Sequence, residues 1–399
     1  MNTVSTHIVT VNAGSSSIKL ALFEPGESPK KILEGVIDNI GQPTASFTKK
    51  NGTAQDAIGA RVSVVDHVAA VRMLIDWVRE QTAQEKIAAI SHRIVHGGVD
   101  YYTPHLINNN LLAGLRTLTI FDPEHLPVAI KIIEMFQVLF PQTPQVACFD
   151  TAFHHDLPRV AQILPIPRRF EATGVRRYGF HGLSCAFVLQ ELQRRAGQDV
   201  ANGRLIIAHL GSGVSLTAVR GGKSIDTTMG LTPASGVPMS TRSGDIDPGL
   251  ALYLARSQDF SADQFSDMVN FKSGLLGISE TSADMKTLLE HEAHDNRAKE
   301  AIDVFCYQVK KSIGSLAAVL GGVDTLIFTG GMGENAPKVR ARICSGLEFL
   351  GIKIEALRNT AGAEIISADA GAVVVRVIHT DEASTMAQDA WQLLSKRKV

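Results

Sequence analysis

The chain has 399 residues, 45% hydrophobic and 20% charged, which allows buried cores and excludes a largely disordered protein. Its 39 basic and 40 acidic residues give a net charge of −1, so no basic excess favours nucleic acid or an anionic membrane surface as a partner. No apolar run reaches the roughly 18 residues of a transmembrane helix, and the first residues do not resemble a signal peptide. The four cysteines lie far apart, as is typical of free thiols in a reducing compartment. We therefore expect a soluble, cytoplasmic α/β enzyme of two or three domains.

The first predicted elements are two strands, His7–Asn12 and Ile18–Phe23, joined by a turn of small residues. Asp66 is expected to cap an amphipathic helix, because apolar residues follow it at helical spacing. A strand over Ile87–Ile90 is then predicted to end in the polar, glycine-containing segment Ser91–Gly98. Open α/β sheets bind their ligands at such strand ends, so this segment is a candidate site.

The same pattern recurs about half the chain length later. The predicted strands Arg204–His209 and Val214–Val219 are joined by the small-residue turn Leu210–Gly213. In both copies an apolar strand leads into a Gly/Ser hairpin, which starts at Gly14 in the first and Gly211 in the second, and a second apolar strand follows. The chain therefore contains either two like domains or two hairpins that merely look alike.

The C-terminal third begins with a long amphipathic helix, Ala301–Leu320, which Gly321-Gly322 is predicted to end. A strand over Val323–Phe328, the glycine-rich segment Thr329–Asn335 and a helix from Pro337 follow. A strand that runs into glycines and then into a helix is typical of an anion-binding loop.

Glycine-rich turns follow predicted strands at Gly14, Gly211 and Gly330, and such turns allow backbone N–H groups to approach a phosphate closely. Each can be a simple turn, but together they indicate a nucleotide held by several loops. No GxxxxGK[ST] motif is present, so a P-loop fold is not expected. The segment Gly331–Ala336 also fits a dinucleotide fingerprint, with Glu355 about 20 residues further on, which leaves an NAD-dependent dehydrogenase as an alternative.

Cationic and titratable side chains gather in predicted loops: Arg93, His96, His125, Asp150, His154, His155, Arg176, Arg177, His181 and Arg242. A phosphoryl-transfer enzyme needs cations around a polyanionic group. Any single arginine can instead form a surface salt bridge, and the pair His154-His155 is more simply read as structural. His291 and His294 lack the HExxH spacing and are expected on the surface. The polar segment Thr241–Pro248, by contrast, has a composition suited to presenting Arg242 from a fixed backbone.

Taken together, these motifs resemble the acetate kinases along the whole chain: VNAGSSSIK (11–19), HRIVHGG (92–98), FDTAFH (149–154), RRYGFHG (176–182), HLGSGVS (209–215), DTTMGLTP (226–233), TRSGDIDP (241–248), FTGGMGEN (328–335) and HTDEA (379–383). The resemblance implies an α/β fold of two duplicated actin-like (ribonuclease H-like) domains with a nucleotide cleft between them. It places the first domain at residues 1–151, joined by a C-terminal helix over 382–399, and the second at 152–381.

The resemblance further implies a kinase that transfers the γ-phosphoryl group of ATP reversibly to acetate or a similar short acid, giving an acyl phosphate such as acetyl phosphate and ADP. Mg²⁺, or Mn²⁺ in its place, would be the metal, and a homodimer is expected. The alternatives are the dehydrogenase and a non-catalytic actin-like nucleotide-binding protein. A protein that only binds a nucleotide does not need so many charged residues. Their presence therefore argues against the non-catalytic actin-like protein.

Carried over position by position, the resemblance assigns roles to individual residues. Catalytic roles fall to Asp150, His181 and Arg242, and metal binding falls to Asn12 and Glu382. Substrate binding falls to Arg93, which would hold the carboxylate, and to the acyl-pocket residues Val95, Phe180 and Pro233. Nucleotide binding falls to Lys19, His209, Leu210, Gly211, Ser212, Gly213, Asp284, Met285, Lys286, Gly331, Met332, Gly333, Glu334 and Asn335.

The chain departs from the family at several of these motifs. Glu124-His125-Leu126-Pro127 stands where Leu-His-Asn-Pro is usual, Ser212 and Lys286 replace Asn and Arg, and Leu183-Ser184-Cys185 replaces Thr-Ser-His. Glu124 therefore takes the place of an apolar acyl-pocket residue. Either the altered loop turns Glu124 toward solvent or an arginine, or Glu124 lines the pocket and selects a longer or hydroxylated acid.

Overall fold

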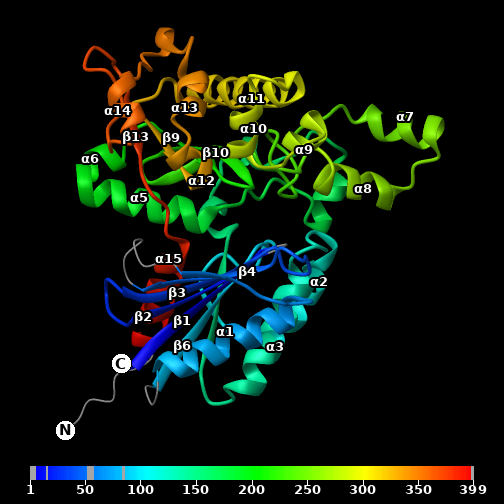
Figure 1. The fold of residues 1–399 in the computed structure, drawn as a ribbon, viewed down its shortest axis with the longest axis vertical. Coiled ribbons are helices and arrows are strands. Elements are labelled where there is room, and N and C mark those ends of the chain that lie inside the picture. Colours follow the sequence, from blue (N-terminus) through cyan, green and yellow to red (C-terminus); the bar gives the residue numbers. More distant parts are fainter. Residues whose placement is uncertain (1–5, 15–16, 52–57, 83–85, 397–399) are drawn as a thin grey trace. The chain divides into compact units, whose positions relative to one another are not determined.

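The structure, a computed structural model, describes residues 6–14, 17–51, 58–82 and 86–396. The chain separates into two compact units (Figure 1). We call Met1–Ala152 with Asp381–Val399 unit 1, and Phe153–Thr380 unit 2. The last helix, α15 (Glu382–Ser395), therefore belongs to the same unit as the N-terminal strands.

Unit 1 is built on an eight-stranded sheet of order β5-β4-β3-β2-β1-β6-β8-β7. Neighbouring strands from β5 to β1 are antiparallel, β6 and β8 run parallel to β1, and β7 is an antiparallel edge strand. The strands are β1 (Thr6–Ala13), β2 (Ile18–Glu24), β3 (Lys30–Asp38), β4 (Ser46–Asn51), β5 (Ile58–Arg61), β6 (Lys86–Ile94), β7 (His105–Leu106) and β8 (Gln145–Phe149).

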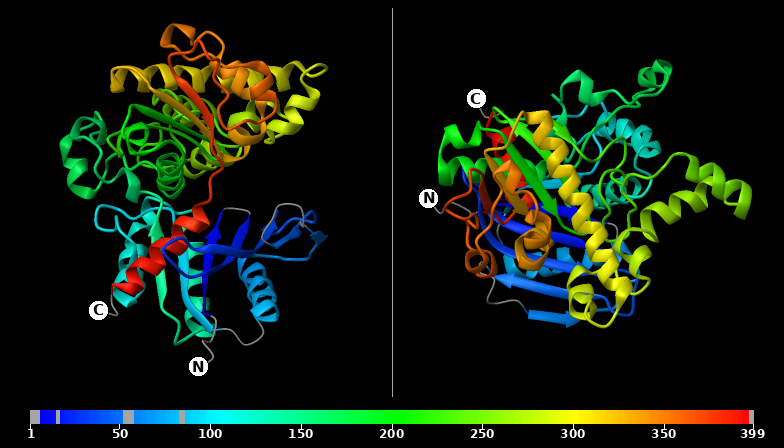
Figure 2. Two further views of the ribbon diagram at one scale, coloured as in Figure 1. Left: turned by 90° about the vertical axis from the view of Figure 1, so that its left-hand side faces the viewer. Right: turned by 90° about the horizontal axis from the view of Figure 1, so that it is seen from above.

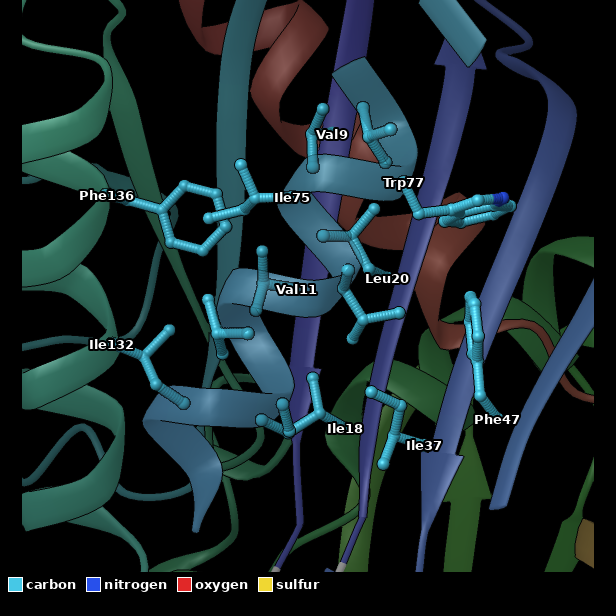
Figure 3. Close-up of a cluster of buried hydrophobic side chains, with 14 of the residues drawn as sticks. Val9, Val11, Ile18, Leu20, Ile37, Phe47, Ile75, Trp77, Ile132 and Phe136 are labelled. Atoms are coloured by element: carbon cyan, nitrogen blue, oxygen red, sulfur yellow. The ribbon is translucent and has the colours of Figure 1, made fainter. Parts of the chain in front are cut away.

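Helices cover both faces of this sheet: α1 (His67–Thr82), α2 (Asn109–Thr117) with the 3-10 turn η2 (Leu118–Ile120), α3 (Leu126–Leu139) and α15. Because strand side chains alternate, Val9 and Val11 of β1 face the same way, and they pack in one cluster with Trp77 of α1 and Phe136 of α3. Figure 3 shows this cluster, with α15 behind the strands on the opposite face.

Unit 2 has a five-stranded sheet of order β11-β10-β9-β12-β13, in which β9 to β11 are antiparallel and β12 and β13 run parallel to β9. The strands are β9 (Leu205–Leu210), β10 (Val214–Arg220), β11 (Lys223–Thr227), β12 (Thr325–Thr329) and β13 (Val374–Val377). The 3-10 turn η3 (Ala152–His154) crosses the unit boundary. The remaining helices are α4 (Arg159–Gln162), η4 (Arg168–Thr173), α5 (Gly182–Ala196), α6 (Gln198–Ala201), α7 (Gly249–Gln258), α8 (Ala262–Phe271), α9 (Gly274–Ser279), α10 (Met285–His291), α11 (Asn296–Leu320), α12 (Gly330–Asn335), α13 (Pro337–Cys344), η5 (Glu348–Leu350) and α14 (Ala356–Thr360).

The core of unit 2 is likewise layered. Leu205 and Ile207 of β9 pack against Val188 and Leu192 of α5. The long helix α11 packs on the other side of the same strands, and Figure 2 shows it lying along the sheet. The sheet has two antiparallel and two parallel strand pairs, and helices cover both of its faces. Its strands are therefore apolar, and every residue from Leu205 to Leu210 is buried.

The two sheets share one topology. In unit 1 the strands β3-β2-β1-β6-β8 have the same order and directions as β11-β10-β9-β12-β13 in unit 2. The hairpins β1–β2 and β9–β10, whose similarity the sequence suggested, hold the same place in each. The duplicated actin-like α/β fold is thereby confirmed.

Three element predictions need correction. Strand β6 does not end at Ile90 but continues to Ile94, because β1 and β8 flank it and bury its polar residues. The segment after β12 is a short helix, α12, and not a loop. Helix α11 begins at Asn296, before Ala301, because the side chain of Asp295 accepts a hydrogen bond from the backbone N–H of Arg297 at 2.9 Å.

Several other expectations concern features of the whole chain. None of the four cysteines forms a disulfide, and all are buried. Within the described ranges, no helix combines the length and apolar character that crossing a bilayer requires. Ser15 and Ser16 of the predicted phosphate-binding turn lie outside the described residues, as do residues 397–399 of the predicted C-terminal helix.

Candidate active site

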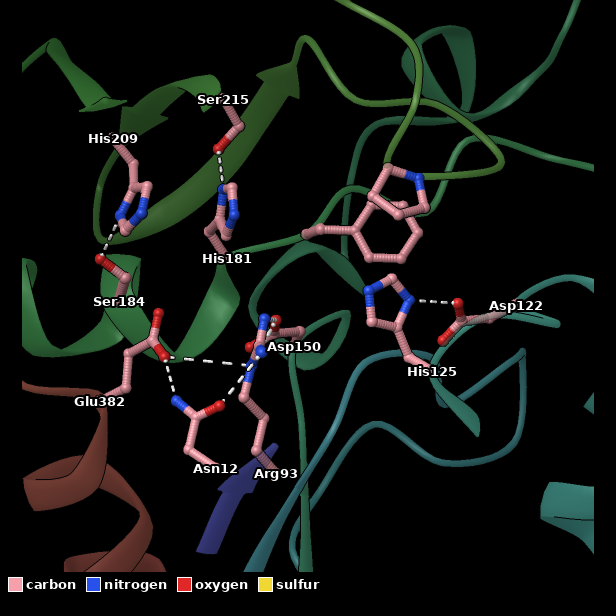
Figure 4. A network of polar contacts seen from close by, with 12 residues as sticks. Asn12, Arg93, Asp122, His125, Asp150, His181, Ser184, His209, Ser215 and Glu382 are labelled. Carbon is pink, nitrogen blue, oxygen red and sulfur yellow. Dashed lines mark hydrogen bonds and ion pairs between the residues drawn. The ribbon is translucent and has the colours of Figure 1, made fainter. Parts of the chain in front are cut away.

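In unit 1, four polar side chains meet at one edge of the sheet. Asn12 lies near the end of β1, Arg93 near the end of β6, Asp150 directly after β8, and Glu382 at the start of α15. Strands β1, β6 and β8 are parallel, so their carboxyl ends share this edge. Figure 4 shows the four side chains turned toward one another. Asn12 and Glu382 are far apart in the sequence, and they come together because α15 packs on β1 and β6.

Hydrogen bonds connect these groups. Arg93 Nε donates to Asp150 Oδ2 at 2.9 Å, and Arg93 Nη2 pairs with the same oxygen. Arg93 Nη1 donates to Asn12 Oδ1 at 3.2 Å, and Asn12 Nδ2 donates to Glu382 Oε2 at 2.9 Å. Glu382 Oε2 also lies 3.9 Å from Arg93 Nε. One guanidinium is therefore held between two carboxylates and an amide.

Burial sets the electrostatics of this group. Asp150 is fully buried, and burial raises the pKa of its carboxyl while the Arg93 guanidinium against it acts in the opposite direction. Burial alone would lower the pKa of Arg93, but Asp150 and Glu382 raise it above its ordinary value, so the guanidinium stays charged. Asp150 Oδ1 is buried without a hydrogen-bond partner within the described part of the chain. A buried oxygen in this state is expected where a bound ligand or water completes a site.

Two further residues belong to this neighbourhood. Lys19 lies directly opposite Asn12 in the β1–β2 pairing, so both side chains are on one face, and Lys19 is exposed. Between α2 and α3, His125 Nδ1 lies 2.7 Å from Asp122 Oδ1 (Figure 4). Burial raises the pKa of Asp150, and the His125 imidazole opposes that rise only in small part. Sequence reasoning missed Asp122, although an Asp three residues before a His at a helix start is a usable signal.

Unit 2 holds a second group, around the β9–β10 hairpin. His181 precedes α5 with φ 58° and ψ 28°, a left-handed conformation that is uncommon for a residue with a side chain. Its Nδ1 lies 2.9 Å from Ser215 Oγ, and its ring stacks on His209 with centroids 4.2 Å apart. His209 Nδ1 lies 2.8 Å from Ser184 Oγ on α5 (Figure 4). Both imidazoles are therefore fixed in orientation.

The hairpin turn brings Gly213 against two of the predicted catalytic residues. A Cβ at position 213 would lie 3.0 Å from His181 Nε2 and 3.5 Å from Arg242 Nη1. A Cβ there would press on the His181 ring, which would have to shift by a few tenths of an ångström, and would only touch Arg242. His181 and Arg242 thus both lie against the backbone turn at Gly213, and Arg242 brings a positive charge there.

The backbone around Arg242 is pinned, as its sequence suggested. The carbonyl oxygen of Arg242 accepts from Met239 N at 3.0 Å, and Ser243 N donates to Val269 O at 2.9 Å. Thr241 Oγ1 donates to Asn270 O at 2.8 Å. These bonds connect the segment to α8, through Val269 and Asn270, and to Met239 just before it. The backbone that carries Arg242 is therefore fixed in place.

Two charged side chains, Glu334 and Arg340, hold the backbone of the glycine-rich helix α12. Glu334 Oε1 accepts from the backbone N–H groups of Gly330 at 2.9 Å and Thr380 at 3.0 Å, and Oε2 lies 2.8 Å from His379 Nδ1. The buried Arg340 donates to the carbonyl oxygens of Gly333 and Glu334 at 2.8 and 2.9 Å. Glu334 thus joins α12 to the chain after β13. Arg340 is a supporting residue that sequence reasoning missed.

Comparison with known proteins now decides the family. Residues 7–388 match the family model described as "Acetokinase family". The chain belongs to the acetokinase family. It is 41% identical over 392 residues to an acetate kinase of Rhodopseudomonas palustris (strain ATCC BAA-98 / CGA009), covering 97% of this chain and 98% of that protein. An acetate kinase of Bacillus cytotoxicus is also 41% identical, over 394 residues, with 97% and 98% covered.

Solved structures agree with this assignment. The crystal structure of a propionate kinase from Francisella tularensis subsp. tularensis SCHU S4 has a TM-score of 0.89 at 36% identity, covering 96% of this chain and 98% of that one. Acetate kinase from Porphyromonas gingivalis has a TM-score of 0.85 at 32% identity, covering 98% and 100%. Membership in the acetokinase family makes the protein a phosphotransferase and confirms the kinase interpretation.

The dehydrogenase alternative is wrong on structural grounds as well. In a dinucleotide fold, the acidic residue after the glycines ends a strand and contacts the ribose. Here the side chain of Glu355 caps α14, accepting from the backbone N–H groups of Leu357 and Arg358 at 3.0 and 2.7 Å. The sheet beside α12 also contains antiparallel strands, unlike the parallel sheet of that fold.

The remaining acyl-pocket residues assigned from the acetokinase resemblance belong to both units. Val95 of unit 1 and Phe180 of unit 2 are buried, Pro233 is half-buried, and its carbonyl oxygen accepts from Arg242 at 3.5 Å. Glu124 is half-buried in unit 1.

The nucleotide assignments also fall into different surroundings. Leu210 and Met285 are core residues, and Gly333 is buried. Asp284 caps α10, Asn335 Nδ2 donates to Gly331 O at 3.0 Å, and Gly211 and Met332 are half-buried. Ser212, Lys286, Gly331 and Asn335 are exposed.

Other residues from the cationic cluster brace the fold. His96 is buried and its Nδ1 accepts from the backbone N–H of Gly98 at 3.0 Å. Arg177 Nη1 donates to the carbonyl oxygen of Thr227 at 2.9 Å, and Arg176 Nη2 donates to that of His155 at 3.4 Å. His291 and His294 are exposed, and the described residues contain no group of three or more His, Cys, Asp or Glu side chains that could hold a metal.

Proposed function

We propose that the protein transfers the γ-phosphoryl group of ATP, reversibly, to the carboxylate of acetate or a similarly short acid, giving an acyl phosphate and ADP. The observation that carries the proposal is the Arg93 guanidinium, charged, largely buried and oriented by Asp150 and Asn12. The names of the relatives, acetate kinase and propionate kinase, support the same substrate class.

The acceptor needs charge neutralisation more than it needs a base. A carboxylate is already an anionic nucleophile, and its difficulty lies in approaching a polyanionic phosphate chain. Arg93 has N–H groups beyond those bonded to Asp150 and Asn12, and a guanidinium suits a carboxylate geometrically. In this proposal Asp150 orients Arg93 and does not deprotonate the substrate.

The phosphoryl group is assigned to unit 2. His181 and Arg242 at the Gly213 turn would stabilise the negative charge on the transferring group, and the donors are already held in place, so little reorganisation is required. The nucleotide is assigned to the segments around His209–Gly213, Asp284–Lys286 and Gly331–Asn335, with Lys19 reaching its phosphates. Glu334 supports this set through its internal bonds.

A divalent metal fits Asn12 and Glu382. An amide oxygen and a carboxylate are hard oxygen ligands of the kind that Mg²⁺ or Mn²⁺ prefers, and the 2.9 Å hydrogen bond shows that the two side chains are adjacent. When bound, the metal would neutralise phosphate charge. The Asn12 side chain would have to exchange its present contacts for the metal, and Arg93 would then be available to the substrate.

The experiment is a hydroxamate assay with Mg²⁺, ATP and hydroxylamine over acetate, propionate, butyrate, glycolate and lactate, beside an NAD(H) absorbance assay. We expect hydroxamate with the short apolar acids, with modest discrimination because one methylene contributes only about 1 kcal/mol. A strong preference for glycolate or lactate would place Glu124 at the substrate. NAD(H) turnover without hydroxamate would overturn the proposal.

We also propose a cytoplasmic homodimer. The family resemblance supports the dimer, and four buried cysteines without a disulfide support a reducing compartment. Light scattering on the purified protein should give twice the mass of the chain, and a monomer mass would contradict this.

A further inference from the structure

We infer that His154 is a positioning residue for phosphoryl transfer, which holds the main chain at Phe180 so that His181 keeps its backbone conformation and ring orientation. The inference rests on the proposed function, in which His181 contacts the transferring group. The family comparison gave His154 no role, and its sequence context suggested only a structural histidine.

His154 has a defined set of partners. It lies in the turn after β8 and is fully buried. Its Nε2 is 2.9 Å from the carbonyl oxygen of Phe180, and its Nδ1 is 2.9 Å from Ser224 Oγ on β11. A carbonyl oxygen can only accept, so Nε2 carries the proton and Nδ1 accepts from the Ser224 hydroxyl. Burial also lowers the pKa of His154 to about 4, so the ring is neutral at neutral pH.

The same ring contacts the residue before Phe180. Gly179 has φ +77°, and a Cβ there would lie 2.7 Å from His154 Cγ and 2.6 Å from Thr227 Cγ2. The imidazole therefore packs directly on the backbone of Gly179 while it bonds to the next carbonyl. His154 contacts two consecutive residues of the segment that leads into His181.

His181 needs this support because its own conformation is unfavourable. A residue with a side chain in the left-handed region costs on the order of 1 kcal/mol or more and persists only where the surroundings enforce it. Ser215 and His209 hold its ring, but its φ depends on the peptide unit that joins it to Phe180, whose oxygen His154 holds. Losing that bond would let the peptide rotate and shift the imidazole.

His154 cannot itself be a catalytic residue in this arrangement. Both of its ring nitrogens are bonded within the protein, and the side chain has no exposed surface. Its effect on the reaction must therefore pass through His181, in which a displacement of about 1 Å can cost on the order of 100-fold in rate.

Two amide substitutions separate the bonds of the imidazole. The amide of Gln reaches the position of Nε2, so His154→Gln can still donate to Phe180 O. The amide of Asn reaches only the position of Nδ1, so His154→Asn keeps a partner for Ser224 and loses the bond to Phe180. Ser224→Ala is the matched control, because it removes the other hydrogen bond of the same ring and leaves Phe180 held.

In the hydroxamate assay at saturating ATP and acetate, we expect His154→Asn to lower kcat about 10- to 100-fold. The KM for acetate, from rates over a range of acetate concentrations at saturating ATP, should change less than about threefold, because Arg93 is not altered. His154→Gln should recover most of kcat, and Ser224→Ala should keep it within about threefold while lowering Tm. Should His154→Asn fail to fold, His154→Phe, which keeps a ring against Gly179, replaces it.

The ¹⁵N signals of the His181 ring in the nucleotide-free protein provide a readout independent of activity. They should shift in His154→Asn and not in Ser224→Ala. If the wild type forms no hydroxamate, the proposed function fails while the spectra still test the His154 contact. If kcat and the His181 signals stay at wild-type values in His154→Asn, or if Ser224→Ala loses as much kcat as His154→Asn, His154 only stabilises the fold and the inference is wrong.

Discussion

Asp150→Asn separates the charge of the buried carboxylate from its shape, and so tests whether Asp150 orients Arg93 or acts as a base. The substitution keeps an oxygen that can accept from Arg93 but removes the negative charge that neutralises the guanidinium. Asp150 is fully buried and the Arg93 side chain is only 14% exposed, so water can compensate little of the loss.

The expected magnitude follows from this burial. Removing one partner of a buried ion pair lowers the free energy of unfolding by about 3–5 kcal/mol. Because the amide keeps one hydrogen bond to Arg93, we expect a loss of about 3 kcal/mol for Asp150→Asn. The same loss of orientation should lower kcat/KM for acetate about 100-fold, since each 1.4 kcal/mol or so is tenfold. Most of the change should be a higher KM for acetate, because Arg93 is the group released. Unit 1 should melt roughly 6–12 °C lower.

The assay is hydroxamate formation as a function of acetate concentration at several pH values from 5 to 9, with thermal unfolding of both proteins. If Asp150 only positions Arg93, both enzymes have the same shape of pH profile. A general base would instead give a fall in kcat of about 100- to 10,000-fold, an unchanged KM and the loss of the acidic limb. That outcome would refute our reasoning, as would an Asp150→Asn enzyme with wild-type kcat/KM.

Three other predictions concern the remaining charged groups. Arg242→Ala should lower kcat roughly 100- to 10,000-fold, with only partial recovery in Arg242→Lys, which lacks the planar fork; an active alanine variant would remove Arg242 from the site. Glu382→Ala should raise the Mg²⁺ concentration needed for half-maximal rate while Tm changes little, and wild-type Mg²⁺ dependence would show that Glu382 holds no metal. Burial raises the pKa of Asp389, beside Cys148, to about 6. The folded protein therefore binds this proton more tightly than the unfolded chain does, and ionisation of the carboxylate destabilises the fold increasingly from about pH 4, with the full effect above about pH 6. Asp389→Asn should be more stable than wild type by up to about 3 kcal/mol at pH 8, with the difference vanishing near pH 4; a difference independent of pH in urea unfolding would contradict this.

Local pattern was enough to predict much of this protein. The alternation of apolar residues and the small-residue turns predicted the hairpins β1–β2 and β9–β10, and helical spacing predicted α1 and most of α11. The motifs also predicted the family and the residue types of the candidate site. The hairpins and helices depend on neighbours within a few residues along the chain, where turns, caps and amphipathic faces act, whereas the family and the site residues were implied by the resemblance of the motifs.

What the side chains contact was decided by tertiary structure. Arg93 was expected in a loop, but pairing with the flanking strands extends β6 to Ile94, so Arg93 lies within the strand. The parallel register of β6 and β8 then places Arg93 beside Asp150. The sequence could not show that the Glu334 carboxylate bonds to backbone groups of α12 and of the chain after β13. His154 gained its position because a glycine 25 residues later lets its ring approach. Each outcome depends on which distant segments pack together, and hydrogen bonds form with whatever that packing brings within reach.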